Sequence, residues 1–262
     1  MNTSLNKITL WLTRPKGQAG NLTDLLEKRG AKVFHFPVIE IQTLLQNKSS
    51  RNKIKNLDQY DMAFFISTNA ARIGMEFIKN NCFKLPASIN YFCSGPATAM
   101  VLQSYGLKVY YPKKKMRTED LLILPELKNI LQKENKKNNQ AIIFRGKGGR
   151  DLLTKTLKSK GVNVEYIELY KRVAPEYKKK YLKNILLAEK PDGIVFSSAE
   201  AIQNFSNLFE KFYPEYKKLN IVVSSPRLRD IASKVGFETI SLVKGADDKS
   251  IASGVEVSNG RS

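Results

Sequence analysis

Short apolar runs alternate along the chain with longer segments in which apolar and polar positions follow a helical period. Six runs of four to six residues predict buried β-strands, at Ile8–Thr13, Met62–Ile66, Ile89–Cys93, Ala141–Arg145, Gly193–Phe196 and Ile221–Ser224. Helical patterns follow them at about residues 17–29, 68–80, 96–105, 148–160, 198–212 and 226–235. Strands that are apolar on both faces and alternate with helices predict an α/β fold, with parallel sheet covered on both sides.

Two further helices are expected. One begins near Thr118, whose side chain can cap it, and is broken at Pro125. The C-terminal sequence ADDKSIASGVEVSNGRS predicts only a weak last helix with a frayed end, because it contains Gly254 and ends in polar residues.

The whole pattern repeats at an offset of 131 residues. The segment ITLWLTRPKGQAGNLTDLLEKRGAKVFHFPVIEI matches QAIIFRGKGGRDLLTKTLKSKGVNVEYIELYKRV, so that Arg14 falls on Arg145. Two later pairs of segments keep the same order, with Ser67 on Ser198 and Ser94 on Ser225. Three matches in one order and at nearly one offset indicate an internal duplication.

Small polar residues and two arginines follow the carboxyl ends of the predicted strands. Open α/β sheets bind ligands at this edge. Each Ser or Thr taken alone is explained as a helix cap, but the same chemistry at six strand ends favours a binding face. The candidate binding residues are Arg14, Ser67, Thr68, Asn69, Ser94, Gly95, Thr98, Arg145, Gly146, Ser197, Ser198 and Ser225.

The stretch FRGKGGRDLL at residues 144–153 has the strand, Gly-rich turn and helix start of an anion site. It lacks the spacing of a Walker loop and of a dinucleotide fingerprint. Its glycines are therefore expected mainly to shape the turn, while exposed amides there could still accept a carboxylate.

The formal net charge of +20 favours an anionic partner, although the basic residues are mostly lysines spread along the chain. Cys82 and Cys93 are expected to be structural thiols, and His35 a structural strand residue. No zinc spacing, paired carboxylates or activated nucleophile is present, which favours chemistry that depends on positioning. The chain has no apolar run long enough for a membrane span and no signal peptide, so a cytoplasmic location is expected.

One residue breaks the symmetry of the repeat. Tyr170 falls opposite Ile39 of the first copy. A hydroxyl placed where its twin is aliphatic is a candidate for function, and the alternative is a strand tyrosine whose ring packs while its hydroxyl meets water.

Taken together, LTRPKGQAGNLTDLLEKRGAKVFHFPVIEI, STNAAR, GPATAMVLQSYGLKV, RGKGGRDLLTKTLKSKGVNVEYIELYKRV and FSSAEAIQNF resemble the uroporphyrinogen-III synthase family, from about residue 8 to 243. The resemblance implies two α/β domains joined by a two-stranded antiparallel linker, with the active site in the cleft between them. Residues 1–37 would join 174–262 in one domain, 43–165 would form the other, and 36–42 and 166–173 would be the linker strands.

The same resemblance implies a lyase of tetrapyrrole and heme biosynthesis. It would close hydroxymethylbilane to uroporphyrinogen III with inversion of ring D and loss of water, as a monomer and with no cofactor. Tyr170 would assist departure of the hydroxyl, Thr98 would contact substrate, and Ser67 with Ser197 or Ser198 would match polar positions of the cleft. The many carboxylates of the substrate suit the positive charge, and a transient hand-over from hydroxymethylbilane synthase is left open.

The main alternative is a non-catalytic, two-lobed protein that binds an anionic ligand or nucleic acid. Nucleic acid is disfavoured, because the aromatic residues sit in apolar strand patterns and are not interleaved with arginine. A membrane partner is not expected either.

Overall fold

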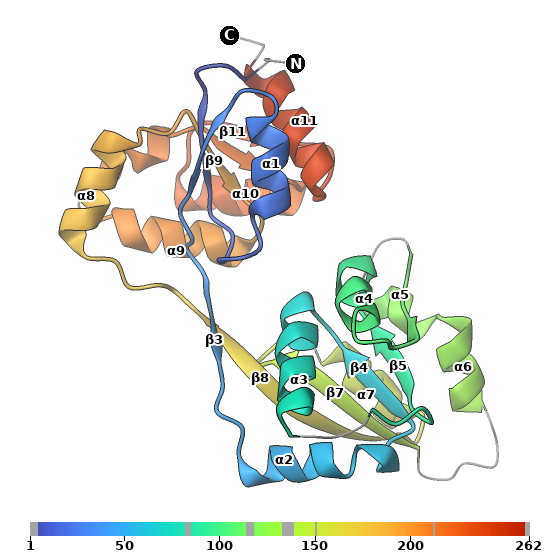
Figure 1. The fold of residues 1–262 in the computed structure, drawn as a ribbon. Coiled ribbons are helices and arrows are strands. Elements are labelled where there is room, and N and C mark those ends of the chain that lie inside the picture. The colour runs from blue at the N-terminus through green and yellow to red at the C-terminus, as the bar shows by residue number, and fades with distance from the viewer. Residues whose placement is uncertain are drawn as a thin grey trace. The chain divides into compact units, whose positions relative to one another are not determined.

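A computed structural model describes residues 5–81, 85–113, 118–132, 139–149, 151–211 and 213–259. The chain divides into two compact units (Figure 1). The first unit contains Met1–Ile41 and Val173–Ser262, and the second contains Gln42–Arg172. No helix among the described residues is long and apolar enough to cross a membrane.

A five-stranded parallel sheet forms the centre of the first unit. Its strand order is β11-β10-β9-β1-β2, and the strands are β1 (Thr9–Leu12), β2 (Lys32–His35), β9 (Gly193–Phe196), β10 (Ile221–Val223) and β11 (Ile240–Leu242). Helices lie on both faces, as α/β architecture requires when strands are apolar on both sides. They are α1 (Gly20–Glu27), α8 (Lys179–Ala188), α9 (Ala199–Phe209), α10 (Pro226–Val235) and α11 (Asp248–Asn259), with a 3-10 turn at Pro214–Lys218.

Successive side chains of β1 pack on opposite faces of this sheet. Trp11 belongs to a core with residues of α8, α9 and α10. Leu10 and Leu12 belong to a second core with residues of α1 and α11. That second core includes Ile251, Ala252 and Val255 of α11, so apolar burial holds the helix that the sequence indicated only weakly.

The second unit is built on a six-stranded sheet of order β3-β8-β7-β4-β5-β6. The strands are β3 (Glu40–Thr43), β4 (Met62–Phe65), β5 (Asn90–Cys93), β6 (Val109–Tyr110), β7 (Gln140–Gly146) and β8 (Asn163–Val173), and β4 to β8 pair in parallel. Its helices are α2 (Lys48–Lys55), α3 (Thr68–Asn80), α4 (Pro96–Gln103), α5 (Thr118–Leu122), α6 (Pro125–Gln132) and α7 (Leu152–Ser159), with a 3-10 turn at Leu57–Gln59. The predicted α/β class with parallel sheets flanked by helices is thus confirmed.

The two faces of the second sheet carry separate groups of helices. Phe64 and Ile143 share a core with residues of α5, α6 and α7. On the other face, Phe65 and Phe144 stack with ring centroids 4.3 Å apart and lie against Gly74 of α3. Alternate residues of β4 and β7 therefore anchor opposite layers, and the start of α3 is fixed at the carboxyl edge of the sheet.

The two copies of the sequence repeat are exchanged between the sheets. β1 belongs to the first copy but pairs with β9, which belongs to the second. β7 belongs to the second copy but pairs with β4, which belongs to the first. The exchange places Arg14 in the first unit and its repeat partner Arg145 in the second.

Candidate functional site

The carboxyl edge of the second sheet brings Tyr170 and Ser67 together. Tyr170 lies on β8, is 3% exposed, and its hydroxyl oxygen is 2.9 Å from Ser67 Oγ. Ser67 follows β4 and caps α3, where its Oγ accepts a hydrogen bond from the Ala70 N–H at 3.0 Å. The Ser67–Tyr170 pair holds two hydroxyl hydrogens and uses only one between the two oxygens. The other hydrogen is left to donate to a third group.

Three further hydroxyls form a chain at the same edge. Thr98 Oγ1 lies 3.2 Å from Ser94 Oγ and 3.4 Å from Thr68 Oγ1. Thr98 is 3% exposed, whereas Ser94 and Thr68 are half-buried. Gly95 is the cap residue of α4 and precedes Pro96, the first residue of that helix. The half-buried hydroxyls can turn to a ligand while Thr98 fixes their spacing.

Asn69 lies in the first turn of α3 and is half-buried, next to the hydroxyl-bearing residues of this edge. Gly146 ends β7 and stands opposite Tyr170 in the strand register. The residues predicted to bind in the second unit therefore lie at one edge of one sheet. Besides Asn69 and Gly146, they are Ser67, Thr68, Ser94, Gly95, Thr98 and Tyr170.

Arg145 differs from the other residues of this edge because its guanidinium turns back into its own loop. The side chain is 6% exposed, donates to the carbonyl oxygens of Gly146 and Gly148, and lies 3.3 Å from Asp151 Oδ1. It also stacks over the Tyr166 ring, 5.1 Å from the centroid. These contacts show that Arg145 braces the Gly-rich turn of the stretch FRGKGGRDLL.

The first unit offers a second group of polar residues at the carboxyl edge of its own sheet. Arg14 follows β1, and its Nε donates to Ser197 Oγ at 3.0 Å. Its Nη1 forms an ion pair with Asp248 Oδ1 at 2.6 Å and also donates to the Gln18 carbonyl at 3.4 Å. The two charged side chains are 15% and 22% exposed. A carboxylate that binds Arg14 therefore has to share the guanidinium with Asp248 or replace it.

Two serines of the first unit act as helix caps. Ser198 accepts from the Ala201 N–H at 3.1 Å at the start of α9, and Ser225 accepts from the Leu228 N–H at 3.3 Å at the start of α10. A cap satisfies one of the unpaired N–H groups of a helix start and leaves others for an anion. Ser198 and Ser225 thus have the structural role that the sequence allowed, at positions where a carboxylate can also bind.

The sequence reasoning missed Asp248. This residue begins α11 and pairs with Arg14, and its Oδ2 accepts from Asn21 Nδ2 at 2.6 Å. A signal was present in ADDKS, because an acidic residue is favoured in the first turn of a helix. Nothing in the sequence pattern connected that turn to Arg14.

Of the remaining candidates for chemistry, His35 and Cys93 have structural surroundings. His35 Nε2 donates to the Arg14 carbonyl at 2.8 Å. Cys93 is buried, and burial raises the pKa of its thiol to about 11. Cys82 lies outside the described residues. Among the described residues, no group of three or more His, Cys, Asp or Glu side chains is placed to hold a metal ion.

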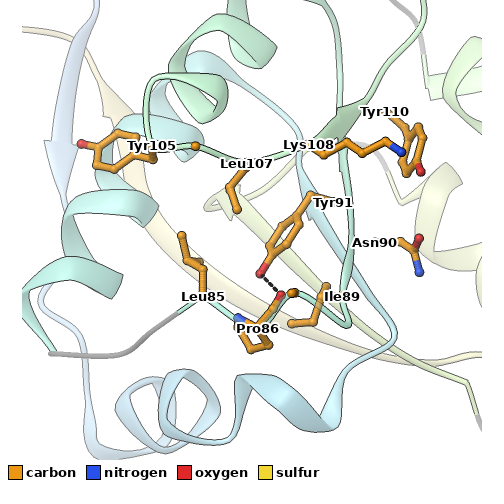
Figure 2. A pocket seen from close by; sticks show the side chains of 11 residues that line it. Leu85, Pro86, Ile89, Asn90, Tyr91, Tyr105, Leu107, Lys108 and Tyr110 are labelled. Carbon is orange, nitrogen blue, oxygen red and sulfur yellow. Dashed lines mark hydrogen bonds between the residues drawn. The ribbon is translucent and has the colours of Figure 1, made fainter.

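A pocket of about 630 Å³ lies at the opposite edge of the second sheet (Figure 2). Its walls come from residues that precede β5 and β6, including Leu85, Ile89 and Lys108. Tyr91 lies in this pocket and donates to the Pro86 carbonyl at 3.1 Å, and burial raises the pKa of its hydroxyl to about 12. Because parallel strands share their direction, this pocket is separate from the polar residues at the carboxyl edge.

Comparisons with known proteins agree on one family. A family model described as uroporphyrinogen-III synthase HemD matches residues 20–252. The chain is 30% identical over 247 residues to uroporphyrinogen-III synthase of Escherichia coli strain K12, covering 93% of this chain and 98% of that protein. It is 27% identical over 234 residues to a putative uroporphyrinogen-III synthase of Methanocaldococcus jannaschii, covering 87% and 90%.

Solved structures support the fold. A mutant uroporphyrinogen III synthase from the extremely thermophilic bacterium Thermus thermophilus superposes with a TM-score of 0.61 at 16% identity, covering 97% of this chain and all of the other. The synthetase of Helicobacter pylori gives 0.59 at 14% identity, covering 97% and 98%. Because the family model spans most of the sequence, this chain belongs to the uroporphyrinogen-III synthase family, whose members are hydro-lyases of tetrapyrrole biosynthesis.

Proposed function

We propose that this chain closes hydroxymethylbilane to uroporphyrinogen III with inversion of ring D, and that the Ser67–Tyr170 pair supplies the proton for loss of water. The observation that carries the proposal is the 2.9 Å contact between the two hydroxyls at a ligand-binding edge. This contact joins Tyr170, which breaks the symmetry of the repeat, to Ser67, the first residue of STNAAR.

The chemical step requires the terminal hydroxyl of the substrate to leave. Its C–O bond breaks, the bonding electrons stay on oxygen, and a proton supplied at that oxygen completes a water molecule. The remaining pyrrole is then a protonated azafulvene, which becomes the azafulvene when its N–H proton passes to solvent, and solvent returns a proton to the Ser67–Tyr170 pair. The spare hydrogen of the Ser67–Tyr170 pair is suited to this transfer, because general acids act over a hydrogen bond or through one relay group.

The next steps are governed by geometry. The substituted carbon of ring D attacks the azafulvene, and the spiro intermediate fragments and closes again to the inverted ring. Unassisted closure gives the symmetric type I isomer, so selectivity requires ring D to be held in one orientation. The Thr98 hydroxyl lies within 3.4 Å of both the Ser94 and the Thr68 hydroxyl, and the three together offer such a hold.

The charge distribution favours a substrate with many carboxylates. The chain has a formal net charge of +20, and both sheets carry helix starts at their carboxyl edges. Capping serines such as Ser67 and Ser225 leave first-turn N–H groups that attract anions. Arg14 adds a positive side chain at the edge of the first sheet, next to Ser197.

The experiment uses hydroxymethylbilane generated in place by its deaminase. The purified chain is added, the products are oxidised, and the type I and type III porphyrin isomers are separated. We expect type III to predominate and Tyr170→Phe to lower kcat about 10²- to 10⁴-fold, the range of a lost general acid. Tyr105→Phe is the matched control, because Tyr105 is 42% exposed and lines the pocket at the opposite edge.

Two results would count against the proposal. Type I product at the uncatalysed rate from a folded chain would contradict the activity and favour the non-catalytic binding protein. Type III product at full rate from Tyr170→Phe would leave the activity but remove the role of Tyr170.

A further inference from the structure

Gly146 is the last residue of β7. Because glycine weakens a strand, its presence at this position requires a structural explanation. A left-handed backbone is one ordinary reason, and it holds for Gly148 and Gly149, with φ of 74° and 110°. Gly146 is not among the residues with positive φ. Its lack of a side chain must therefore be explained by what lies next to it.

The space next to Gly146 is taken by the ring of Tyr170. A Cβ atom added to Gly146 would lie 2.7 Å from Cε2 and 2.7 Å from Cζ of that ring, and 3.1 Å from its hydroxyl oxygen. Carbon atoms in good contact are about 3.5–4.0 Å apart. Any residue other than glycine would force the ring to move.

The ring has little room to move. Tyr170 is 3% exposed, and its backbone is fixed because the Lys147 N–H donates to its carbonyl oxygen at 2.7 Å. The strand register shifts between Arg145 and Gly146, so that Gly146 faces Tyr170 directly. A rigid phenol pushed at Cζ carries its hydroxyl with it, and this changes the geometry of its contact with Ser67 Oγ.

We propose that Gly146 is a positioning residue, whose missing side chain forms a slot that aims the Tyr170 hydroxyl at Ser67. This inference rests on the role of Tyr170 given under the proposed function. In this role Gly146 acts through the ring of Tyr170 and needs no contact with substrate. The stretch FRGKGGRDLL therefore serves the reaction by fixing the position of the Tyr170 ring through Gly146. Gly148 and Gly149 have a different role, because they provide the left-handed backbone of the turn.

Gly146→Ala tests the inference in two backgrounds. In the wild-type chain we expect kcat to fall roughly 10- to 100-fold with little change in KM, because a displacement of about 1 Å has such an effect on a reacting group. In a Tyr170→Phe chain the same substitution should change kcat by less than about twofold, since coupled residues are not additive.

Gly74→Ala is the matched control for crowding. Its Cβ would lie 3.0 Å from Phe65 and 3.1 Å from Leu169, in the core of the same unit, and Tyr170 is not among the three nearest contacts. It should change thermal stability without changing kcat per folded molecule. Retention of full kcat by Gly146→Ala, or an equal loss in both backgrounds, would overturn the role of Gly146 and leave that of Tyr170. Full kcat in Tyr170→Phe would overturn both.

A measurement on the unsubstituted backbone covers the case in which Gly146→Ala does not fold. 3-Fluorotyrosine placed at position 170 reports the confinement of the ring by fluorine NMR. A ring held in the slot gives resonances displaced from that of the free amino acid and not averaged between its two orientations. A single averaged resonance shows a ring that turns freely and overturns the inference.

Discussion

Ser67 Oγ lies 2.9 Å from the hydroxyl oxygen of Tyr170, although 103 positions separate the two residues in the chain. The same Oγ accepts the Ala70 N–H as the cap of α3. One atom thus caps the start of a helix and orients a phenol, so the stability of α3 and the placement of the Tyr170 hydroxyl depend on the same side chain.

Ser67→Ala separates these two roles. Loss of the cap should lower the free energy of unfolding by about 1 kcal/mol. Loss of the hydroxyl partner should in addition lower kcat, because the Tyr170 hydroxyl is no longer oriented. Asn47→Ala is the control, since Asn47 caps α2 by accepting from the Ser50 N–H at 2.9 Å. Thermal unfolding and the type III assay measure both effects, and an unchanged kcat in Ser67→Ala would show that the cap is its whole role.

Arg145→Gln should affect stability more than substrate binding. The guanidinium donates to Gly146 and Gly148 carbonyls and is 6% exposed, so its loss frees the Gly-rich turn. We expect the free energy of unfolding to fall by about 2 kcal/mol, the scale of a hydrogen bond to a charged group. Lys147→Gln removes the same charge from an exposed neighbour and should leave stability unchanged. A higher KM with unchanged stability in Arg145→Gln would instead indicate contact with substrate.

Alkaline pH should destabilise the second unit through two buried groups of β5. Burial raises the pKa of Cys93 from 9.0 to about 11 and that of Tyr91 from 10.0 to about 12. Between each pair of values the unfolded chain has released a proton that the folded chain still holds, so stability falls as the pH rises. These two groups leave stability unchanged below about pH 8.

Urea unfolding midpoints across this range measure the effect. Tyr91→Phe should make the decline above about pH 10 less steep, because one of the two groups that titrate has been removed while Cys93 remains. Tyr105→Phe is the control that removes a tyrosine hydroxyl from the same pocket, where Tyr105 is 42% exposed. A decline of equal slope in Tyr91→Phe would assign the alkaline loss to other residues.

Strand positions could be predicted from the sequence because buried strands need uninterrupted apolar runs. Gly193–Phe196 was predicted with the bounds it has in the structure, and the run at Met62–Ile66 forms β4 one residue shorter. The helix α2 (Lys48–Lys55) was not predicted, because Ile54 is its only buried residue and gives no periodic apolar face. Pro125 was expected to break a helix, and the structure ends α5 at Leu122 and begins α6 at Pro125.

The candidate site was predictable only in part. Residues such as Ser67 and Ser94 follow strands directly, so their place at the carboxyl edge follows from chain order. The direction of a long side chain does not, because it depends on partners that are remote in sequence. Arg14 meets Asp248 across 234 positions, and Arg145 turns to a carbonyl three positions away. Two residues that the repeat makes equivalent thus have different contacts, which the sequence pattern could not distinguish.

Asp248→Asn should strengthen substrate binding through Arg14. In the structure Asp248 holds the Arg14 guanidinium at 2.6 Å, so a substrate carboxylate that binds Arg14 would compete with this side chain for the same donors. The asparagine amide keeps the shape of the carboxylate but removes its charge. Displacing it from Arg14 by a substrate carboxylate therefore costs less free energy. We expect KM to fall up to about tenfold, equivalent to about 1.4 kcal/mol. Thermal stability should fall slightly, because α11 loses an acidic residue of its first turn.

Asp247→Asn is the matched control for Asp248→Asn. Asp247 precedes α11 and bonds Ser250, and the side-chain and backbone hydrogen bonds from Ser250 lower the pKa of its carboxyl. Its loss should weaken the helix start without releasing Arg14, so KM should stay unchanged while stability falls. A KM that rises in Asp248→Asn would show that Asp248 positions Arg14 for the substrate and does not compete with it. Adding Arg14→Gln to the Asp248→Asn chain should abolish the change in KM that Asp248→Asn causes. Both interpretations, competition with substrate and positioning of Arg14, act through the Arg14 guanidinium.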